Sequence, residues 1–223
     1  MGAGALSPSR SRSDDGFQGP ARGADRAVLL AHGAGADMHA AALTAVADAL
    51  ADARIPSLRF DFPYRAAGRR APDRPPVLLA AVRDAAAELA RRAKVTPDRL
   101  VLGGRSMGGR IASMAAADAD DPLPALGLAL LGYPLHPPGK AEQLRVEHFA
   151  RLRMPVLFVS GTRDAFGTPA ELKRHAKKVK GTVSFAWIDT GDHGFKPLKS
   201  SGLSAADALA VAARAVVDFV QAL

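Results

Sequence analysis

Residues 100–110 read LVLGGRSMGGR, a short apolar run followed by the pattern Gly-x-Ser-x-Gly around Ser106. The apolar run predicts a buried strand and the residues after Ser106 predict a helix, so the serine lies at a sharp turn between them. Glycines two residues before and after the serine leave room for such a turn, and the helix N-terminus favours an oxyanion beside it. The stretch therefore indicates a nucleophilic serine on a strand–turn–helix unit.

Short apolar runs and amphipathic helical patterns alternate on both sides of this stretch. The predicted strands are Ala27–Ala31, Ile55–Phe60, Leu100–Leu102, Leu126–Leu131, Val156–Val159 and Val183–Ile188. The predicted helices are Ala40–Ala53, Val77–Ala93, Met107–Ala117, Glu171–Val179 and Ala205–Val220. Neighbouring parallel strands need a crossover, which a helix supplies. The alternation therefore predicts an α/β fold with a mostly parallel central sheet of about six strands and helices on both faces.

The N-terminal residues differ in composition from the rest of the chain. Residues 1–25 are rich in Gly, Ser, Pro and charge and contain almost nothing to bury. They predict a flexible leader in front of a single domain over residues 26–223. We expect no antiparallel strands before Arg26, because this leader has too few apolar residues to form them.

Composition excludes several classes of protein. Of the 223 residues, 48% are hydrophobic and 23% are charged, as in an ordinary globular protein. No uninterrupted apolar stretch approaches the roughly 18 residues of a membrane span, and no signal peptide is recognisable, so a cytoplasmic protein without a membrane partner is expected. The formal net charge is +8, but aromatic residues make up only 5% and the arginines are dispersed, so no nucleic-acid partner is expected.

We also expect no cofactor and no metal ion. The glycines after the first strand begin a dinucleotide-binding pattern, but Met38 stands at its third glycine position. The spacing of His32, Asp37 and His39 matches no zinc motif. The chain has no cysteine, which excludes disulfides and thiolate sites. No coiled-coil pattern or exposed apolar stripe indicates an oligomer.

The loops after the predicted strands carry groups that act together in serine hydrolases. Active sites in open α/β sheets lie at the carboxyl ends of the strands. Asp164 follows the strand Val156–Val159 and His193 follows the last strand, which completes the chain order Ser, Asp, His. The loop after the first strand contains Ala34, whose backbone N–H is expected to bind an oxyanion together with that of Met107. The combination of these loops is far more specific than any one of them.

Other acids and histidines near these loops have their own interpretations. Asp189 and Asp192 are alternative acids, although both lie so near His193 in the sequence that its far ring nitrogen is hard to reach. His32 is expected to bond backbone around the oxyanion loop. His175 lies on a basic helix whose face is expected to be solvated.

A further set of residues is expected either to line a substrate pocket or to pack elsewhere in the protein. For its basic members the alternatives are an anionic substrate and an internal salt bridge. The set consists of His39, Arg59, Tyr64, Arg105, His136 and His148. The stretch 133–150 is short and contains three prolines, so it predicts a minimal lid over a fairly open site.

Six stretches resemble the α/β-hydrolase superfamily, in a small dienelactone-hydrolase-like branch that includes bacterial predicted hydrolases, a testis-expressed homologue and a subunit of a histone-acetyltransferase complex. They are HGAGADMH (32–39), RFDFPY (59–64), GGRSMGGR (103–110), GYPLHPPGK (132–140), GTRDAFG (161–167) and GDHGFK (191–196). The resemblance implies a compact α/β-hydrolase fold with nucleophile Ser106, acid Asp164 and base His193, and with Met107 and Ala34 as oxyanion donors. It implies no particular substrate.

Two functions of different classes follow from these observations. The first is a serine hydrolase that cleaves a small ester or thioester through an acyl-enzyme, with a small-molecule acyl substrate. Lactone and amide hydrolysis and perhydrolysis use the same triad and stay open. The alternative is a catalytically silent binding or scaffold protein with the hydrolase fold. The presence of all three catalytic residue types and both oxyanion loops favours the enzyme.

Overall fold

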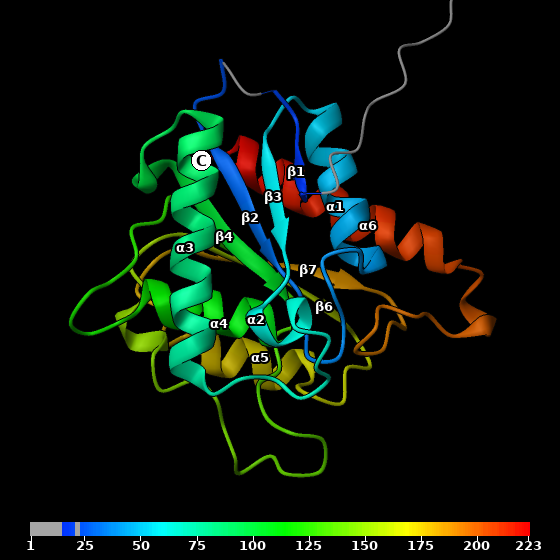
Figure 1. Ribbon diagram of the computed structural model, residues 1–223. Coiled ribbons are helices and arrows are strands. Elements are labelled where there is room, and N and C mark those ends of the chain that lie inside the picture. Colours follow the sequence, from blue (N-terminus) through cyan, green and yellow to red (C-terminus); the bar gives the residue numbers. More distant parts are fainter. Residues whose placement is uncertain (1–14, 21–22) are drawn as a thin grey trace, which may run out of the picture.

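The computed structural model describes residues 15–20 and 23–223 and arranges them around one seven-stranded sheet (Figure 1). The strand order is β1-β3-β2-β4-β5-β6-β7, and every neighbouring pair is parallel except β1 with β3. The strands are β1 (Phe17–Gln18), β2 (Ala27–Ala31), β3 (Ser57–Phe60), β4 (Leu100–Arg105), β5 (Gly127–Leu131), β6 (Val156–Gly161) and β7 (Val183–Ile188). The predicted α/β fold with a mostly parallel sheet is confirmed.

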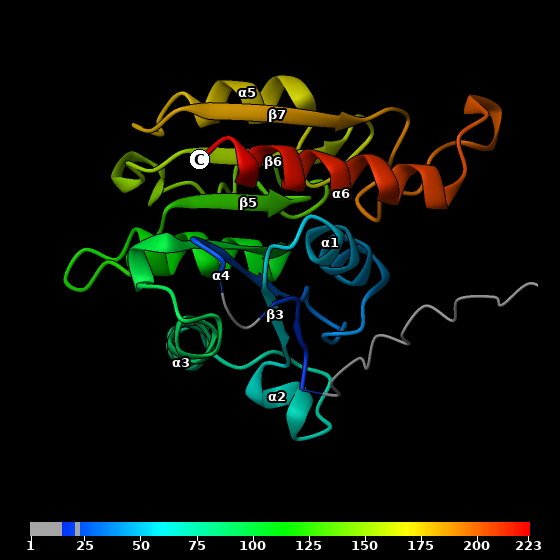
Figure 2. The same ribbon diagram turned by 90° about the horizontal axis from the view of Figure 1, so that it is seen from above.

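Helices cover both faces of the sheet (Figure 2). They are α1 (Ala41–Asp52), α2 (Pro63–Ala66), α3 (Pro75–Ala93), α4 (Met107–Ala116), α5 (Pro169–Ala176) and α6 (Ala205–Gln221), with 3₁₀ turns η1 (Pro97–Arg99), η2 (Phe149–Arg151) and η3 (Lys199–Ser201). Side chains alternate along β2, so that Leu29 belongs to the core cluster that includes residues of α3, α4 and α5, while Leu30 belongs to the cluster that includes residues of α1 and α6. Burial on both faces explains why the central strands read as unbroken apolar runs. Within the described ranges, no helix is long and apolar enough to cross a bilayer.

Most element boundaries differ from the sequence prediction by one to three residues, and two differences have a clear physical reason. Strand β4 continues past Leu102 to Arg105, because the backbone of its glycines pairs with β2 and β5 without needing apolar side chains. Helix α2 lies within the segment predicted as a loop. It begins at Pro63, a position where the missing N–H of proline removes no helical hydrogen bond.

The predicted leader contains a strand, which corrects the expectation that nothing before Arg26 forms one. In β1, Phe17 pairs with Leu58 in antiparallel register, and the guanidinium of Arg92 lies 4.2 Å from the centre of the Phe17 ring. Gln18 donates a hydrogen bond of 2.7 Å to Asp48 on α1. These contacts are all tertiary, so the local composition of residues 15–20 gives no sign of them. The other leader residues, 1–14 and 21–22, lie outside the described residues.

A buried histidine fastens the loop between β5 and β6 to α4. The hydroxyl of Ser113 on α4 donates to the backbone oxygen of Arg110 at 2.8 Å, so His148 donates its Nε2–H to the Ser113 oxygen, also at 2.8 Å. The ring of His148 is 5% exposed. Its burial, together with the charges of Arg110 and Arg151, lowers the pKa of His148 from its ordinary 6.5 to about 4.

We expect this histidine to make the stability of the fold fall with acidification. The unfolded chain binds a proton at His148 below about pH 6.5 and the folded chain only below about pH 4, so stability present above pH 6.5 is lost between these values. The loss is on the order of 3 kcal/mol in the free energy of unfolding. Urea unfolding at several pH values measures it. His148→Gln should flatten this part of the profile, whereas His39→Gln, at an exposed position, should leave it unchanged. Equal slopes in wild type and His148→Gln would contradict the assignment.

Candidate active site

Ser106 lies at the turn from β4 into α4, in a backbone conformation that L-residues rarely adopt, with φ at 51°. The turn presses against the end of β2. A Cβ at Gly104 or at Gly108 would overlap the carbonyl oxygen of Ala31, so both positions require glycine. The backbone N–H of Ser106 donates to Leu131 O on β5 at 2.9 Å, which helps hold the strained residue in place.

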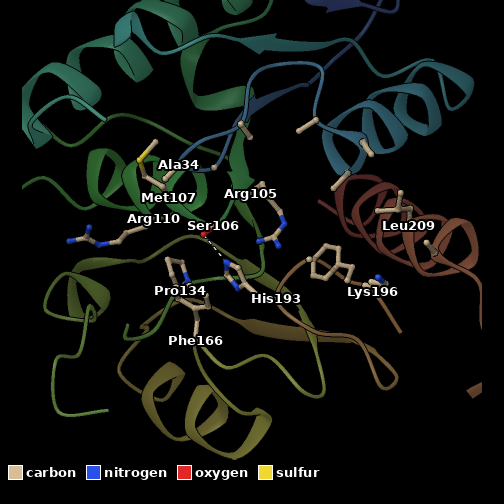
Figure 3. Close-up of a pocket in the computed structure, with 18 of the residues that line it drawn as sticks. Ala34, Arg105, Ser106, Met107, Arg110, Pro134, Phe166, His193, Lys196 and Leu209 are labelled. Atoms are coloured by element: carbon tan, nitrogen blue, oxygen red, sulfur yellow. Dashed lines mark hydrogen bonds between the residues drawn. The ribbon is translucent and has the colours of Figure 1, made fainter. Parts of the chain in front are cut away.

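The structure brings the side chains of Ser106, His193 and Asp164 into one hydrogen-bonded series. The Ser106 hydroxyl lies 2.9 Å from His193 Nε2 (Figure 3). On the other side of the ring, His193 Nδ1 lies 3.0 Å and 2.9 Å from the two carboxylate oxygens of Asp164. A proton on Nδ1 leaves Nε2 free to accept the serine proton, which is the tautomer that a general base requires.

Neighbouring groups fix the orientation of Asp164 and of His193. Asp164 is 1% exposed, and one of its oxygens accepts a hydrogen bond of 2.8 Å from the backbone N–H of Phe166. The Phe166 ring stacks on the His193 ring with centroids 3.9 Å apart. Sequence reasoning missed Phe166, although its position two residues after the acid was a signal that the side chain lies beside the triad.

The two alternative acids, Asp189 and Asp192, accept hydrogen bonds from backbone N–H groups and not from the imidazole of His193. Asp192 accepts hydrogen bonds from the backbone N–H groups of Gly194 (2.8 Å) and Lys196 (2.9 Å), which closes the turn that presents His193. Asp189 accepts from the backbone N–H of Thr190. Of the three acids, Asp164 is the one that meets the ring of His193.

The two expected oxyanion donors lie beside Ser106 (Figure 3). Met107 is the first residue of α4, where a helix leaves its N–H groups without internal acceptors. The loop of Ala34 approaches from β2: a Cβ built on Gly33 would lie 3.5 Å from Cβ of Ser106. Among the described residues, neither the Met107 nor the Ala34 amide donates a backbone hydrogen bond. Both are therefore available to an oxygen bound next to Ser106.

A cavity of about 820 Å³ opens over Ser106 and His193. Alanines of the loop after β2 and of α1 form much of its wall, together with Pro134, Phe166 and Leu209. Four basic side chains and, within the described ranges, no acidic side chain line it. The basic residues are Arg105, Arg110, Arg145 and Lys196.

Arg105 is the one member of the predicted pocket set that lines this cavity. Its guanidinium lies 4.8 Å from the centre of the Phe195 ring. Burial lowers the pKa of Arg105 to about 10, and the charges of Asp164 and Asp192 oppose this shift. The Arg105 guanidinium also donates to the backbone oxygens of Leu131 and Gly132, at 3.4 Å and 3.5 Å.

The other five predicted pocket residues do not line this cavity, which corrects that expectation. Arg59 donates to Met38 O and to Thr44 Oγ1, both at 3.2 Å, and so braces the loop after β2. Tyr64 is buried against the ring of His32. The remaining three are His39, which is exposed, His136, which is buried 3.7 Å from Glu171, and His148, which bonds Ser113.

His32 bonds backbone on both sides, as the sequence predicts. Its Nδ1 lies 2.8 Å from Gly33 O, and its Nε2 accepts a hydrogen bond of 3.1 Å from the N–H of Phe62. The Nδ1–H tautomer satisfies both contacts. Burial also lowers the pKa of His32, which favours this neutral form.

Comparison with known proteins agrees with this architecture. The chain matches a family model described as an alpha/beta hydrolase domain over residues 24–221. Its fold is similar to that of a dienelactone hydrolase from Anabaena variabilis (TM-score 0.67, 21% identity, 92% of this chain and 89% of the other). It is also similar to that of Est1E from Butyrivibrio proteoclasticus with ferulic acid bound (TM-score 0.69, 16% identity, 92% of this chain and 93% of the other). A further similar fold is that of a serine hydrolase without a lid from Xanthomonas campestris (TM-score 0.63, 17% identity, 91% of this chain and 87% of the other). The chain belongs to the alpha/beta hydrolase domain family.

Proposed function

We propose that this protein is a serine hydrolase that cleaves a small ester or thioester through an acyl-enzyme intermediate. The observation that carries the proposal is the hydrogen-bonded series from Ser106 through His193 to the buried Asp164, at the floor of a cavity. A structural serine would not need a strained φ, a neighbouring histidine and an open cavity together.

The proposed reaction uses each of these groups in turn. Ser106 Oγ attacks the acyl carbonyl and gives its proton to His193 Nε2, while Asp164 stabilises the imidazolium that forms. The N–H groups of Met107 and Ala34 bind the oxyanion of the tetrahedral intermediate. His193 then protonates the leaving group. A water molecule, deprotonated by His193, releases the acid and restores Ser106.

The substrate class is inferred from the cavity and from similar proteins. A volume of about 820 Å³ falls within the range of small-molecule sites. Similar folds include a dienelactone hydrolase and an esterase domain, which favours acyl esters. We infer membership of the dienelactone-hydrolase-like branch from the same likeness. The scaffold alternative would leave the intact series of Ser106, His193 and Asp164 without a use.

Reactivity of Ser106 tests the proposal directly. A fluorophosphonate probe should add once to the wild-type protein, as read by intact mass, and Ser106→Ala should abolish both labelling and ester turnover. Ser113→Ala is a matched control, because Ser113 also bonds a histidine but is buried away from the cavity. That variant should still be labelled. An unlabelled but folded wild type would favour the scaffold alternative.

Replacing the acid should separate its role from that of its neighbour. Asp164→Asn removes the charge that stabilises the imidazolium and disturbs the tautomer, so we expect kcat to fall by roughly 10³–10⁴-fold. Asp192→Asn keeps an oxygen that accepts from Gly194 and Lys196, so its kcat should fall by less than about tenfold. Steady-state hydrolysis of a p-nitrophenyl ester measures both. The reverse order of effects would make Asp192 the acid.

A further inference from the structure

Two arginines that line the cavity have no carboxylate partner among the residues that the structure describes. Arg110 lies on α4 and Arg145 on the loop between β5 and β6, and both side chains are partly buried. Within the described part of the chain, neither forms an ion pair. The Nε atom of Arg110 is buried and has no hydrogen-bond acceptor among the described residues. The two side chains therefore present donors and positive charge to the cavity.

The positive charges of Arg110 and Arg145 repel each other. Burial lowers the pKa of Arg145, and the charge of Arg110 lowers it further, with only the Tyr133 hydroxyl acting the other way. The Arg105 guanidinium, in contrast, donates to the backbone oxygens of Leu131 and Gly132 and lies over the Phe195 ring. Lys196 is exposed to solvent. Among the described residues, Arg110 and Arg145 are thus the partly buried cations of the cavity whose side chains form neither a hydrogen bond nor an ion pair.

An anion bound between the two guanidinium groups would remove this cost. Partly buried charges are unfavourable unless paired, and arginine binds carboxylates through two parallel hydrogen bonds. Among the described residues, no acidic side chain lines the cavity, so none can pair with the two guanidinium groups there. A carboxylate on the substrate would supply a compensating charge.

The position of Arg110 relative to the triad indicates which part of the substrate carries the charge. The leaving group must lie next to His193, which protonates it. In Figure 3, Arg110 extends to the side of Ser106 away from His193 and Lys196. The backbone N–H of Arg110 donates to Ser106 O, so Arg110 follows Ser106 by one helical turn on α4. Both side chains line the same cavity, so we expect the far end of a short acyl chain on Ser106 to meet the Arg110 side chain.

We propose that Arg110 and Arg145 bind a carboxylate at the far end of the acyl group, so that the substrates are half-esters or half-thioesters of short dicarboxylic acids. This inference rests on the proposed hydrolase function. It makes the two arginines specificity residues, which contact the substrate away from the reacting carbonyl.

A matched pair of esters tests the inference. p-Nitrophenyl hydrogen adipate and p-nitrophenyl hexanoate have acyl chains of equal length and differ in the terminal carboxylate. We expect the wild type to prefer the adipate in kcat/KM. Arg110→Gln and Arg145→Gln should each lower kcat/KM for the adipate by about tenfold or more and change that for the hexanoate by less than about threefold. Arg174→Gln, an exposed charge change on α5, is the matched control and should alter neither.

Two further measurements make the outcome decisive. The ester 5-hexanoyloxy-2-nitrobenzoate carries its carboxylate on the leaving group, so an arginine-dependent preference for it would overturn the assignment to the acyl side. Free adipate should slow fluorophosphonate labelling of Ser106 more than neutral adipamide does, and Arg110→Gln should abolish that difference. This second readout does not depend on turnover.

The result also separates the inference from the proposed function. A labelled Ser106 with equal rates on the two matched esters, and no protection by adipate, would overturn the carboxylate site and leave the hydrolase standing. An unlabelled Ser106 would overturn both. If Arg110→Gln does not fold, Arg145→Gln on the loop carries the same test.

Discussion

The structure depends on one close contact, between the turn after β4 and the carbonyl oxygen of Ala31 at the end of β2. Only glycine fits at positions 104 and 108 of that turn, and Ser106 between them is held at positive φ, a strain on the order of 1–3 kcal/mol. Because β2 and β4 are neighbours in the sheet, the same contact brings the loop of Ala34 beside the serine. The proposed oxyanion donors and the proposed nucleophile are therefore positioned by a single packing arrangement.

The sequence predicts the strands and the residues that follow them wherever the hydrophobic pattern of a segment and the chemistry of its side chains agree. The parallel strands are buried on both faces, so they appear as apolar runs, and the residues after them include Ser106, Asp164 and His193. Strand β1 could not be predicted, since its stability comes from contacts with β3, α1 and α3. Most of the predicted pocket residues could not be placed either, because sequence position does not tell where a side chain points. For Arg110 the sequence does hold an indication, because it follows Ser106 by one helical turn.

Helix α4 connects several parts of the site. Its first residue, Met107, carries a proposed oxyanion donor, Arg110 lies one turn further along it, and Ser113 anchors the loop between β5 and β6 through His148. That loop in turn supplies Pro134 and Arg145 to the cavity. The loop is thus fastened to the helix that follows Ser106. A change in the packing of α4 would alter the position of Ser106 and the cavity wall together.

The short antiparallel pairing of β1 also has a consequence for the behaviour of the folded protein in concentrated solution. Strand β3 lies beside β2 on one side, and on its other side β1 pairs with Ser57 and Leu58, while Arg59 donates its N–H to Gly16 O. Without residues 15–20, these backbone groups would form an open sheet edge, which is a template for pairing with another chain. Residues 15–20, whose composition predicts a flexible leader, therefore protect the protein against edge-to-edge aggregation.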